Sequence, residues 1–321
     1  MSSGLVAACS SRTSVPPSAS TPAAAGTGVT PTTPVPAPTT AAPAGSTAAL
    51  PAARPWTPRT GEVEPAVKSR ATSLVEAVGT WSDGAGDIAH ARARAAAAGH
   101  APRLADALVP LLGTARSAVA IVRDAQYGGI LTSSASVLVV VDQWRELPDG
   151  TVVAGGTTVD VRLVAARPRW RVVEVLPARP GPAASALSRT ARAVLSDGRI
   201  RLPYAARADV ASGVVHDSVL GLLVSLAQEH VVDVSVIRSG HPHVVFGTSR
   251  TSDHSRGRAV DVWALDGRPF VLPANHALAA TALRYAVAHG AYNVGGPVRP
   301  SGPEYFTDRT HQDHIHLGLP R

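Results

Sequence analysis

The sequence predicts an α+β protein with two folded units, and three observations support this. Helical patterns precede a run of strands in residues 61 to 178, and helices followed by a strand meander suggest a small α+β domain. A second set of helices and strands follows in residues 181 to 321. A chain of 321 residues with 45% hydrophobic content has room for about two domains and a tail.

The tail precedes the folded units. Residues 10 to 60 are mostly Ser, Thr, Ala, Pro and Gly with almost no charge, a composition that buries too little apolar surface to fold, so we expect a disordered, semi-extended linker. Residues 1 to 9 end in Leu-Val-Ala-Ala-Cys, which resembles a bacterial lipobox whose cysteine, Cys9, would carry the lipid anchor. The usual basic start and long apolar stretch are missing. Either translation starts further upstream, which we favour, or the resemblance is accidental.

The first unit reads as helices followed by strands. Pro148-Asp149-Gly150 predicts a turn between two of the strands, and Val159 and Val161 alternate with Thr158 and Asp160 as a half-exposed antiparallel sheet requires. The unit loosely resembles the NTF2-like or cystatin-like domains found outside some bacterial membranes. It contains no catalytic constellation, so we expect a spacer or interaction module. We expect helices over about 62 to 79, 85 to 98 and 102 to 125, and strands over about 132 to 146, 151 to 165 and 169 to 176.

The second unit contains the parts of a compact α+β domain. Its last helix has Asn275 as a plausible N-cap and Gly290 just past its end. The strands are expected to form a central antiparallel sheet. Helices are expected over about 183 to 196, 215 to 230 and 276 to 289, and strands over 231 to 237, 259 to 264 and 314 to 319.

Two short stretches in this unit carry polar groups suited to chemistry. In the first, Asp261 lies in a segment rich in strand formers, and His254 lies in the loop before it. Gly257 stands between them, where a residue tolerant of unusual dihedral angles lets the chain fold back. In the second, strand alternation sends Ile315 to one face and both His314 and His316 to the other.

The two stretches together predict a metal site. Alone, a His-x-His can be a solvent-facing pair, and a single Asp can decorate a strand edge. However, six of the twelve histidines fall in two short windows, namely 241, 243, 254, 311, 314 and 316. Two imidazoles and one carboxylate are typical of a zinc site that keeps a fourth position open for a water molecule, which is the chemistry of amide hydrolysis.

The motifs resemble a known family. The pattern His-x-x-Gly-x-Ala-x-Asp followed by His-x-His is similar to that of the LAS zinc metallopeptidases, in particular the D-Ala-D-Ala carboxypeptidase branch (peptidase M15-like). It is matched here by His254, Gly257, Ala259, Asp261, His314 and His316. The resemblance covers residues 181 to 321 and implies a hedgehog-like fold with Zn²⁺ held by His254, Asp261 and His316. It also implies that His314 is the catalytic general base.

One departure from the family pattern indicates which subgroup of the family the chain resembles. The vancomycin-resistance dipeptidases carry a Glu three residues before the last ligand, where this chain has Asp313. The run His311, His314, His316 instead resembles the murein endopeptidases. The implied function is hydrolysis of peptidoglycan stem or cross-link peptides, by a D,D-carboxypeptidase or a D,D-endopeptidase. The alternative is a catalytically silent, wall-binding or signalling lipoprotein with a hedgehog-like zinc domain.

Further polar residues near the motifs are candidates for substrate binding or for orienting a ligand. An arginine can grip a terminal carboxylate with two hydrogen bonds, an aspartate can accept a hydrogen bond from a ligating imidazole, and loop histidines can line the cleft. In a chain this rich in arginine, the default interpretation of each Arg is a solvated charge. The candidates are Ser239, His241, His243, Arg250, Ser252, Asp253, Arg256, Arg309, His311 and Asp313.

Composition limits partners and location. The net charge of +7 is spread along the chain without a basic block, which argues against nucleic-acid binding but suits an anionic cell wall. Membrane contact is expected only through a lipid anchor at Cys9, so the protein is expected to be extracytoplasmic, either membrane-anchored or secreted to the cell envelope. A chain with one cysteine has no internal disulfide, so its domains must be stabilised by their hydrophobic cores and by metal. Lys68, the only lysine among 30 Lys and Arg residues, reads as high-GC codon bias rather than as chemistry.

Overall fold

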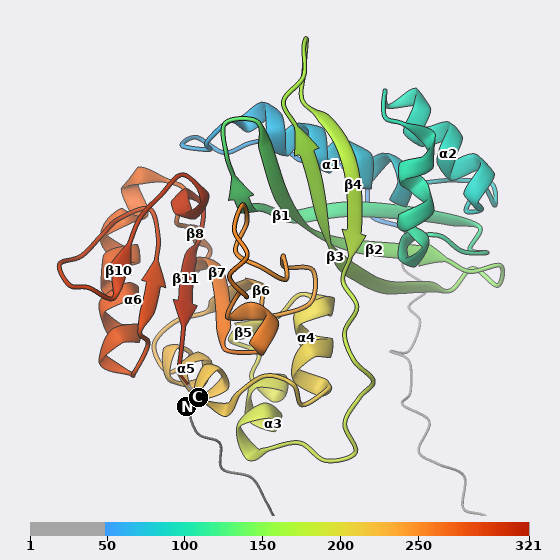
Figure 1. Ribbon diagram of the computed structural model, residues 1–321. Coiled ribbons are helices and arrows are strands. Elements are labelled where there is room, and N and C mark those ends of the chain that lie inside the picture. The colour runs from blue at the N-terminus through green and yellow to red at the C-terminus, as the bar shows by residue number, and fades with distance from the viewer. Residues whose placement is uncertain (1–48, 321) are drawn as a thin grey trace, which may run out of the picture. The chain divides into compact units, whose positions relative to one another are not determined.

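The computed structural model describes residues 49 to 320 and contains two sheets (Figure 1). One is a four-stranded antiparallel sheet, and the other is a separate mixed sheet of seven strands with helices around it. The α+β class expected from the sequence is therefore confirmed. The lipobox interpretation at residues 1 to 9 and the linker interpretation over 10 to 48 lie outside the described residues.

The N-terminal half consists of helices followed by a meander with strand order β1-β2-β3-β4. Its elements are α1 (Pro65–Gly79), α2 (Ile88–Ala97), the 3₁₀ turns η1 (Pro102–Ala107) and η2 (Val109–Leu111), β1 (Ser117–Ile130), β2 (Ser134–Glu146), β3 (Val152–Val164) and β4 (Arg171–Pro177).

Helix α1 packs across the four-stranded sheet (Figure 1). Val67, Ala71, Leu74 and Val78 recur at helical spacing and are fully buried in a core shared with the strands. Pro65 in the first turn suits the helix start because no intrahelical hydrogen bond is lost there. This packing fixes the positions of the other buried side chains of α1, including Lys68.

The helix expected over residues 102 to 125 is wrong. The structure has two short 3₁₀ turns there, followed by the first half of β1. Ala118, Ala120 and Val122 point inward on alternate residues, and their neighbours are partly exposed. This period of two is the strand signal, and the alanine content obscured it because alanine also favours helices.

The packed chain begins before residue 61. The backbone N–H of Trp56 donates to Glu76 of α1 at 2.7 Å, and Arg59 pairs with Asp124 of β1 at 2.9 Å. The guanidinium of Arg59 also lies 4.7 Å from the ring centre of Trp263. The linker expected over residues 10 to 60 therefore ends earlier in the structure, because a tryptophan and an arginine in its last part have partners.

The C-terminal half forms the larger sheet, in the order β10-β9-β11-β7-β6-β5 with β8 paired to β7. The elements are α3 (Arg189–Ser196), β5 (Ile200–Arg201), α4 (Tyr204–Ala211), α5 (Asp217–Leu226), β6 (Val232–Val236), the 3₁₀ turn η3 (His254–Arg256), β7 (Ala259–Leu265), β8 (Arg268–Pro269), the 3₁₀ turn η4 (Pro273–Asn275), α6 (His276–Ala288), β9 (Asn293–Gly295), β10 (Tyr305–Phe306), the 3₁₀ turn η5 (Thr310–Gln312) and β11 (Ile315–Gly318).

This sheet is not wholly antiparallel as expected. The pairs β5–β6 and β9–β10 are parallel, whereas β6, β7, β11 and β9 pair antiparallel. The short strands β5 and β10 lie at the edges, and strands of two residues leave almost no periodicity in a sequence. Within residues 49 to 320, no helix has the length and apolar character needed to cross a membrane.

Candidate metal centre

Sheet register brings two of the expected ligands together. Strands β7 and β11 pair antiparallel with His316 directly opposite Asp261. Side chains of directly opposed residues project from the same face and lie within contact distance. Two residues that are distant in sequence are therefore neighbours because of strand pairing alone.

A glycine allows the third expected ligand, His254, to reach the other two. His254 lies in η3, just before β7, and Gly257 follows with φ +67. A Cβ at this position would lie 2.2 Å from the backbone oxygen of Val214, so a side chain has neither the dihedral angle nor the space it needs. The tight turn brings the His254 ring back over β7.

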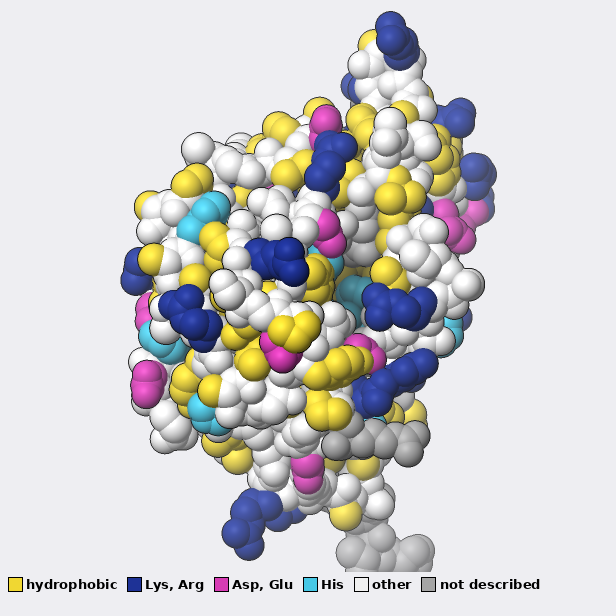
Figure 2. All heavy atoms as spheres, turned by 60° about the vertical axis from the view of Figure 1, so that its left-hand side comes forward, with side chains coloured by type: hydrophobic (Ala, Val, Ile, Leu, Met, Phe, Trp, Pro, Cys, Tyr) yellow, Lys and Arg dark blue, Asp and Glu magenta, His cyan; other side chains and the backbone are white. Residues whose placement is uncertain are grey.

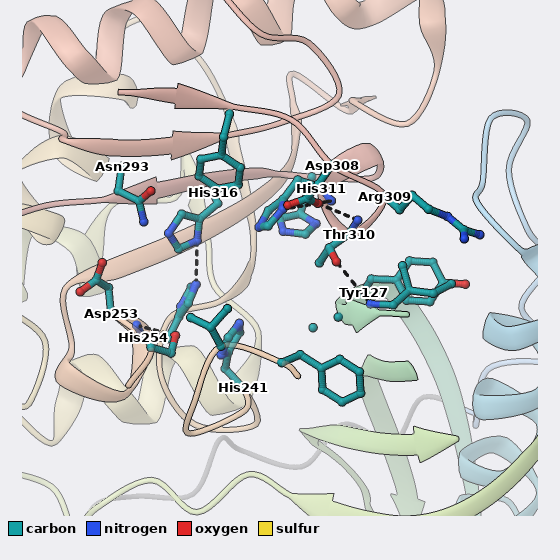
Figure 3. Close-up of a pocket in the computed structure, with 18 of the residues that line it drawn as sticks. Tyr127, His241, Asp253, His254, Asn293, Asp308, Arg309, Thr310, His311 and His316 are labelled. Atoms are coloured by element: carbon teal, nitrogen blue, oxygen red, sulfur yellow. Dashed lines mark hydrogen bonds and ion pairs between the residues drawn. The ribbon is translucent and has the colours of Figure 1, made fainter. Parts of the chain in front are cut away.

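The three side chains converge on one point. His254 Nε2 lies 3.1 Å from Asp261 Oδ1 and 3.0 Å from His316 Nδ1, and His316 Nδ1 lies 3.0 Å from Asp261 Oδ1. His254 is fully buried, and the other two are 1% and 7% exposed. Figure 3 shows the rings of His254 and His316 pointing toward each other.

The hydrogen bonds around these atoms are compatible with a cation between them. His254 donates its Nδ1–H to the carbonyl oxygen of Ile237 at 2.7 Å, so a neutral ring carries a lone pair at Nε2. That lone pair faces Asp261 Oδ1, and a single proton on His316 Nδ1 cannot serve both acceptors. A metal ion would bond to all three atoms at once.

The ionisation states suit a cation. Burial raises the pKa of the Asp261 carboxyl, but the charges of His254 and His314 outweigh it and hold that pKa well below its usual range. Burial lowers the pKa of His316 to about 4, so its ring is neutral at pH 7. An ionised carboxylate beside the neutral His316 imidazole is a donor state that suits a metal ion.

A further histidine contributes to the cluster. His241, His254 and Asp261 each offer an atom within 4.8 Å of the others, and this buried group could hold a metal ion. The His241 ring stacks on His254 with centres 4.0 Å apart, and its Nδ1 bonds the carbonyl oxygen of Pro242 at 2.9 Å. Sequence analysis placed His241 only among the cleft-lining candidates, because a loop residue has no strand or helix spacing that ties it to a ligand.

His314 lies beside this group and is held by a carboxylate. Its Nδ1 is 2.5 Å from Asp313 Oδ1, and its Nε2 is 3.7 Å from Asp261 Oδ2. Burial lowers the pKa of His314, but the charges of Asp261 and Asp313 outweigh burial and raise it. With Nδ1–H donating to Asp313, the Nε2 atom faces the metal group and can accept a proton.

The other residues singled out in the sequence divide into two sets. Arg250, Ser252, Asp253, Arg309 and His311 line a cavity of about 660 Å³ that also contains His241, His254, His314 and His316. Ser239 is instead turned away and donates to Asp209 at 2.5 Å. His243 and Arg256 are exposed and do not line this cavity.

Several of the cavity residues have partners of their own. Asp253 pairs with Arg258 at 3.0 Å and accepts a hydrogen bond from Tyr292, so it does not orient a ligating imidazole. Arg309 lies 3.3 Å from Glu64, a residue of the N-terminal half. His311 lies 2.8 Å from Asp308. Among these candidates, Asp313 is hydrogen-bonded to the expected catalytic histidine, and the ring of His311 lies 5.0 Å from the His314 ring, centre to centre.

The cavity has walls from both sheets. Figure 2 shows histidine side chains within a recess of this face and cationic side chains near its edge. Strand β1 and the residue after it contribute Tyr127, Gly128, Gly129, Ile130 and Leu131. The N-terminal half is therefore part of the boundary of the candidate site rather than a remote module.

Two buried polar side chains of the N-terminal half extend to the site. Gln126 Nε2 is 2.7 Å from Asp261 Oδ2, and Lys68 Nζ is 2.5 Å from Asp313 Oδ2. Sequence analysis gave Lys68 no chemical role. The available signal was helical spacing, because Lys68 shares the buried face of α1 with Thr72 and Val75.

Comparison of the chain with protein-family models, with curated proteins and with solved structures finds no match, so the functional argument rests on the geometry of the site.

Proposed function

We propose that this protein is a zinc-dependent peptidase that hydrolyses peptidoglycan stem or cross-link peptides. The observation that carries the proposal is the triangle of His254 Nε2, Asp261 Oδ1 and His316 Nδ1, with sides of 3.0 to 3.1 Å, beside the buried His314. The substrate class rests on the similarity of these motifs to the LAS metallopeptidases. On the same basis, the C-terminal half is proposed to be LAS-type. The order of helices followed by a strand meander supports the proposal that the N-terminal half is NTF2-like or cystatin-like.

The donor set fits zinc. A tetrahedral zinc ion with bonds of about 2.0 to 2.1 Å separates its ligand atoms by about 3.3 to 3.4 Å, within a few tenths of the observed sides. Calcium and magnesium prefer all-oxygen sites, whereas two imidazoles and one carboxylate suit zinc. Bound there, zinc would polarise a scissile carbonyl and make water acidic enough to attack it near neutral pH.

His316 is a better third ligand than His241. Its Nδ1 is 3.0 Å from both of the other donor atoms, whereas the group that includes His241 spans up to 4.8 Å. Three protein ligands leave a position open for water and substrate, as catalytic zinc sites do.

His314 is proposed as the catalytic base. Its Nε2 accepts a proton as the attacking water adds to the peptide carbonyl, and it returns that proton to the leaving amine nitrogen as the C–N bond breaks. Asp313 keeps Nδ1 protonated and so leaves Nε2 free to act. The carboxylate also stabilises the ring while it carries both protons.

The proposal is tested with the purified full-length protein. Bound zinc is measured by elemental analysis, and muropeptides are incubated with the protein and analysed by mass spectrometry. Loss of a terminal D-alanine identifies a carboxypeptidase, and separation of cross-linked peptides identifies an endopeptidase. Chelation is expected to abolish cleavage, and added zinc to restore it.

The matched control for His314→Ala is His230→Ala. His230 also pairs with an aspartate, Asp266, at 2.7 Å, but it does not line the cavity. We expect cleavage to fall at least about 100-fold in His314→Ala and to persist in His230→Ala. Zinc binding without cleavage of any muropeptide by the wild type would favour the silent wall-binding lipoprotein instead, and absence of zinc would refute the mechanism.

A further inference from the structure

Gln126 is buried at the junction of the two sheets. It lies in β1, is fully buried, and donates Nε2–H to Asp261 Oδ2 at 2.7 Å. Its Oε1 accepts a hydrogen bond from Ser235 of β6. The amide orientation follows from these partners, since a carboxylate oxygen requires a donor. A side chain of the N-terminal sheet thus bonds a candidate metal ligand.

This hydrogen bond separates the two oxygens of Asp261. Oδ2 is occupied by Gln126, and Oδ1 faces His254 and His316. A carboxylate held in this way presents one oxygen to a metal in a fixed direction. Partners of this kind orient metal ligands, and their loss typically weakens metal binding about 10- to 100-fold.

Lys68 has an equivalent relationship with Asp313. It is fully buried, its Nζ lies 2.5 Å from Asp313 Oδ2, and it also pairs with Glu62. The backbone N–H of Tyr127 donates to the same Asp313 oxygen at 3.1 Å. Oδ2 is therefore held by the N-terminal half, and Oδ1 remains for His314 Nδ1.

Lys68 is the cation that the Glu62 and Asp313 carboxyls share. Burial raises the pKa of Glu62 to about 7, although the Lys68 charge opposes that shift. Burial also raises the pKa of Asp313, but Lys68 and His314 lower it to about 2. Without the ammonium group, the Glu62 and Asp313 carboxyls would lie buried near each other without a shared cation.

We infer that Gln126 and Lys68 are positioning residues of the active centre, supplied by the N-terminal half. Gln126 fixes the metal-facing oxygen of Asp261, and Lys68 fixes the Asp313–His314 pair. This inference rests on the proposed function for what the positioned groups do. It gives the N-terminal half a role in chemistry instead of the role of spacer or interaction module expected from the sequence.

The first test compares Gln126→Met with Gln143→Met in the full-length protein. Gln143 is also a buried glutamine of the same sheet with two hydrogen bonds from its amide nitrogen, but its partners, Gly79 and Leu111, belong to the N-terminal half. Zinc affinity is measured by competition with a chelator. We expect a loss of about 10- to 100-fold in Gln126→Met and a change of less than about twofold in Gln143→Met.

The outcomes of this test separate the inference from the proposed function. If the wild type binds zinc and Gln126→Met, shown to be folded by circular dichroism, binds it equally well, the positioning role is refuted and the peptidase proposal stands. If the wild type binds no zinc, both are overturned. Equal loss of affinity in both glutamine variants would show that general destabilisation of the sheet is the cause, and would also refute the inference.

The second test concerns Lys68. In Lys68→Met, combined with Glu62→Gln to avoid an unpaired buried carboxyl, we expect zinc affinity within about twofold of wild type, unchanged KM, and kcat reduced about 10-fold. Glu62→Gln alone keeps the Lys68–Asp313 pair and is the control. A purely structural contact would lower stability without this split between kcat and KM.

A spectroscopic measurement makes the Lys68 test independent of substrate. In ¹⁵N spectra of the histidine rings, recorded above the pKa of His314 and with its signals assigned from His314→Ala, the wild type should show one tautomer protonated at Nδ1. The Glu62→Gln/Lys68→Met protein should show broadened or mixed tautomer signals. Identical His314 signals in the wild type and the double variant would overturn the role of Lys68, whatever the protein cleaves.

Discussion

His316 and Asp261 are directly paired across strands β11 and β7, and their facing atoms, Nδ1 and Oδ1, are 3.0 Å apart. The backbone hydrogen bonds of the two strands hold these residues opposite each other. The cluster is therefore expected to be preorganised for a metal ion, and the predictions below follow from this geometry.

Asp261→Asn is expected to reduce zinc affinity by more than about 100-fold. Loss of a hydrogen bond that only orients a ligand typically costs up to about that much. The amide keeps the shape of the side chain but lacks its negative charge, and its nitrogen would meet either the metal or Gln126. Chelator competition measures the effect. Asp253→Asn is the control because that aspartate lies at the cavity but pairs with Arg258, and unchanged affinity in Asp261→Asn would remove Asp261 from the ligand set.

Gly257→Ala is expected to destabilise the protein by about 2 to 4 kcal/mol and to weaken metal binding. The added Cβ meets the Val214 oxygen at 2.2 Å, and φ is +67. Gly267→Ala is the matched control, since φ there is +69 and no atom lies within 4 Å. Urea unfolding of both variants separates dihedral strain, which they share, from the clash, which only Gly257→Ala has. Equal losses would contradict the packing argument.

Gly129→Ala is expected to destabilise the protein by about 1 to 3 kcal/mol, because the new Cβ would lie 2.2 Å from Phe246. This glycine lets the end of β1 approach the loop that forms another wall of the cavity. Gly155→Ala in β3 meets nothing within 4 Å and serves as the control. Thermal unfolding checks the difference, which should vanish if β1 does not approach this loop in solution.

His100→Gln is expected to reduce the loss of stability on acidification. Burial, with the charges of Arg70 and Arg169, lowers the pKa of His100 to about 4, below its usual value of 6.5. Between these values the unfolded chain binds a proton that the folded protein does not. The contribution of His100 to the free energy of unfolding is therefore fully present above pH 6.5 and is lost as the pH falls toward 4. Urea titrations of metal-free protein at pH 7 and pH 4 should show a difference on the order of 1 kcal/mol. The same pH dependence in both proteins would contradict it.

The sequence predicted those parts of the fold and site that have a strong local period. β2, β3 and α6 lie within two residues of their expected bounds, because their apolar residues repeat with strand or helix spacing. His254, Asp261, His314 and His316 were singled out from motif spacing, and the structure brings these four side chains together.

Other features depend on tertiary contacts that no local pattern encodes. β5 and β10 are two residues long, and β1 is rich in alanine, so tertiary pairing decides their conformation. Gln126 and Lys68 are ordinary residues of a strand and a helix until the two sheets meet. Their role could not be assigned without knowing which face of the N-terminal sheet covers the cluster.

The burial of Lys68 has a practical consequence. It is the only lysine in the chain, and none of its side chain is accessible in the folded protein. Amine-selective reagents should therefore leave this position unmodified unless the N-terminal sheet lifts away from the C-terminal half. Peptide mapping after a brief pulse of such a reagent would then report how often the two halves separate, with a single natural residue as the probe.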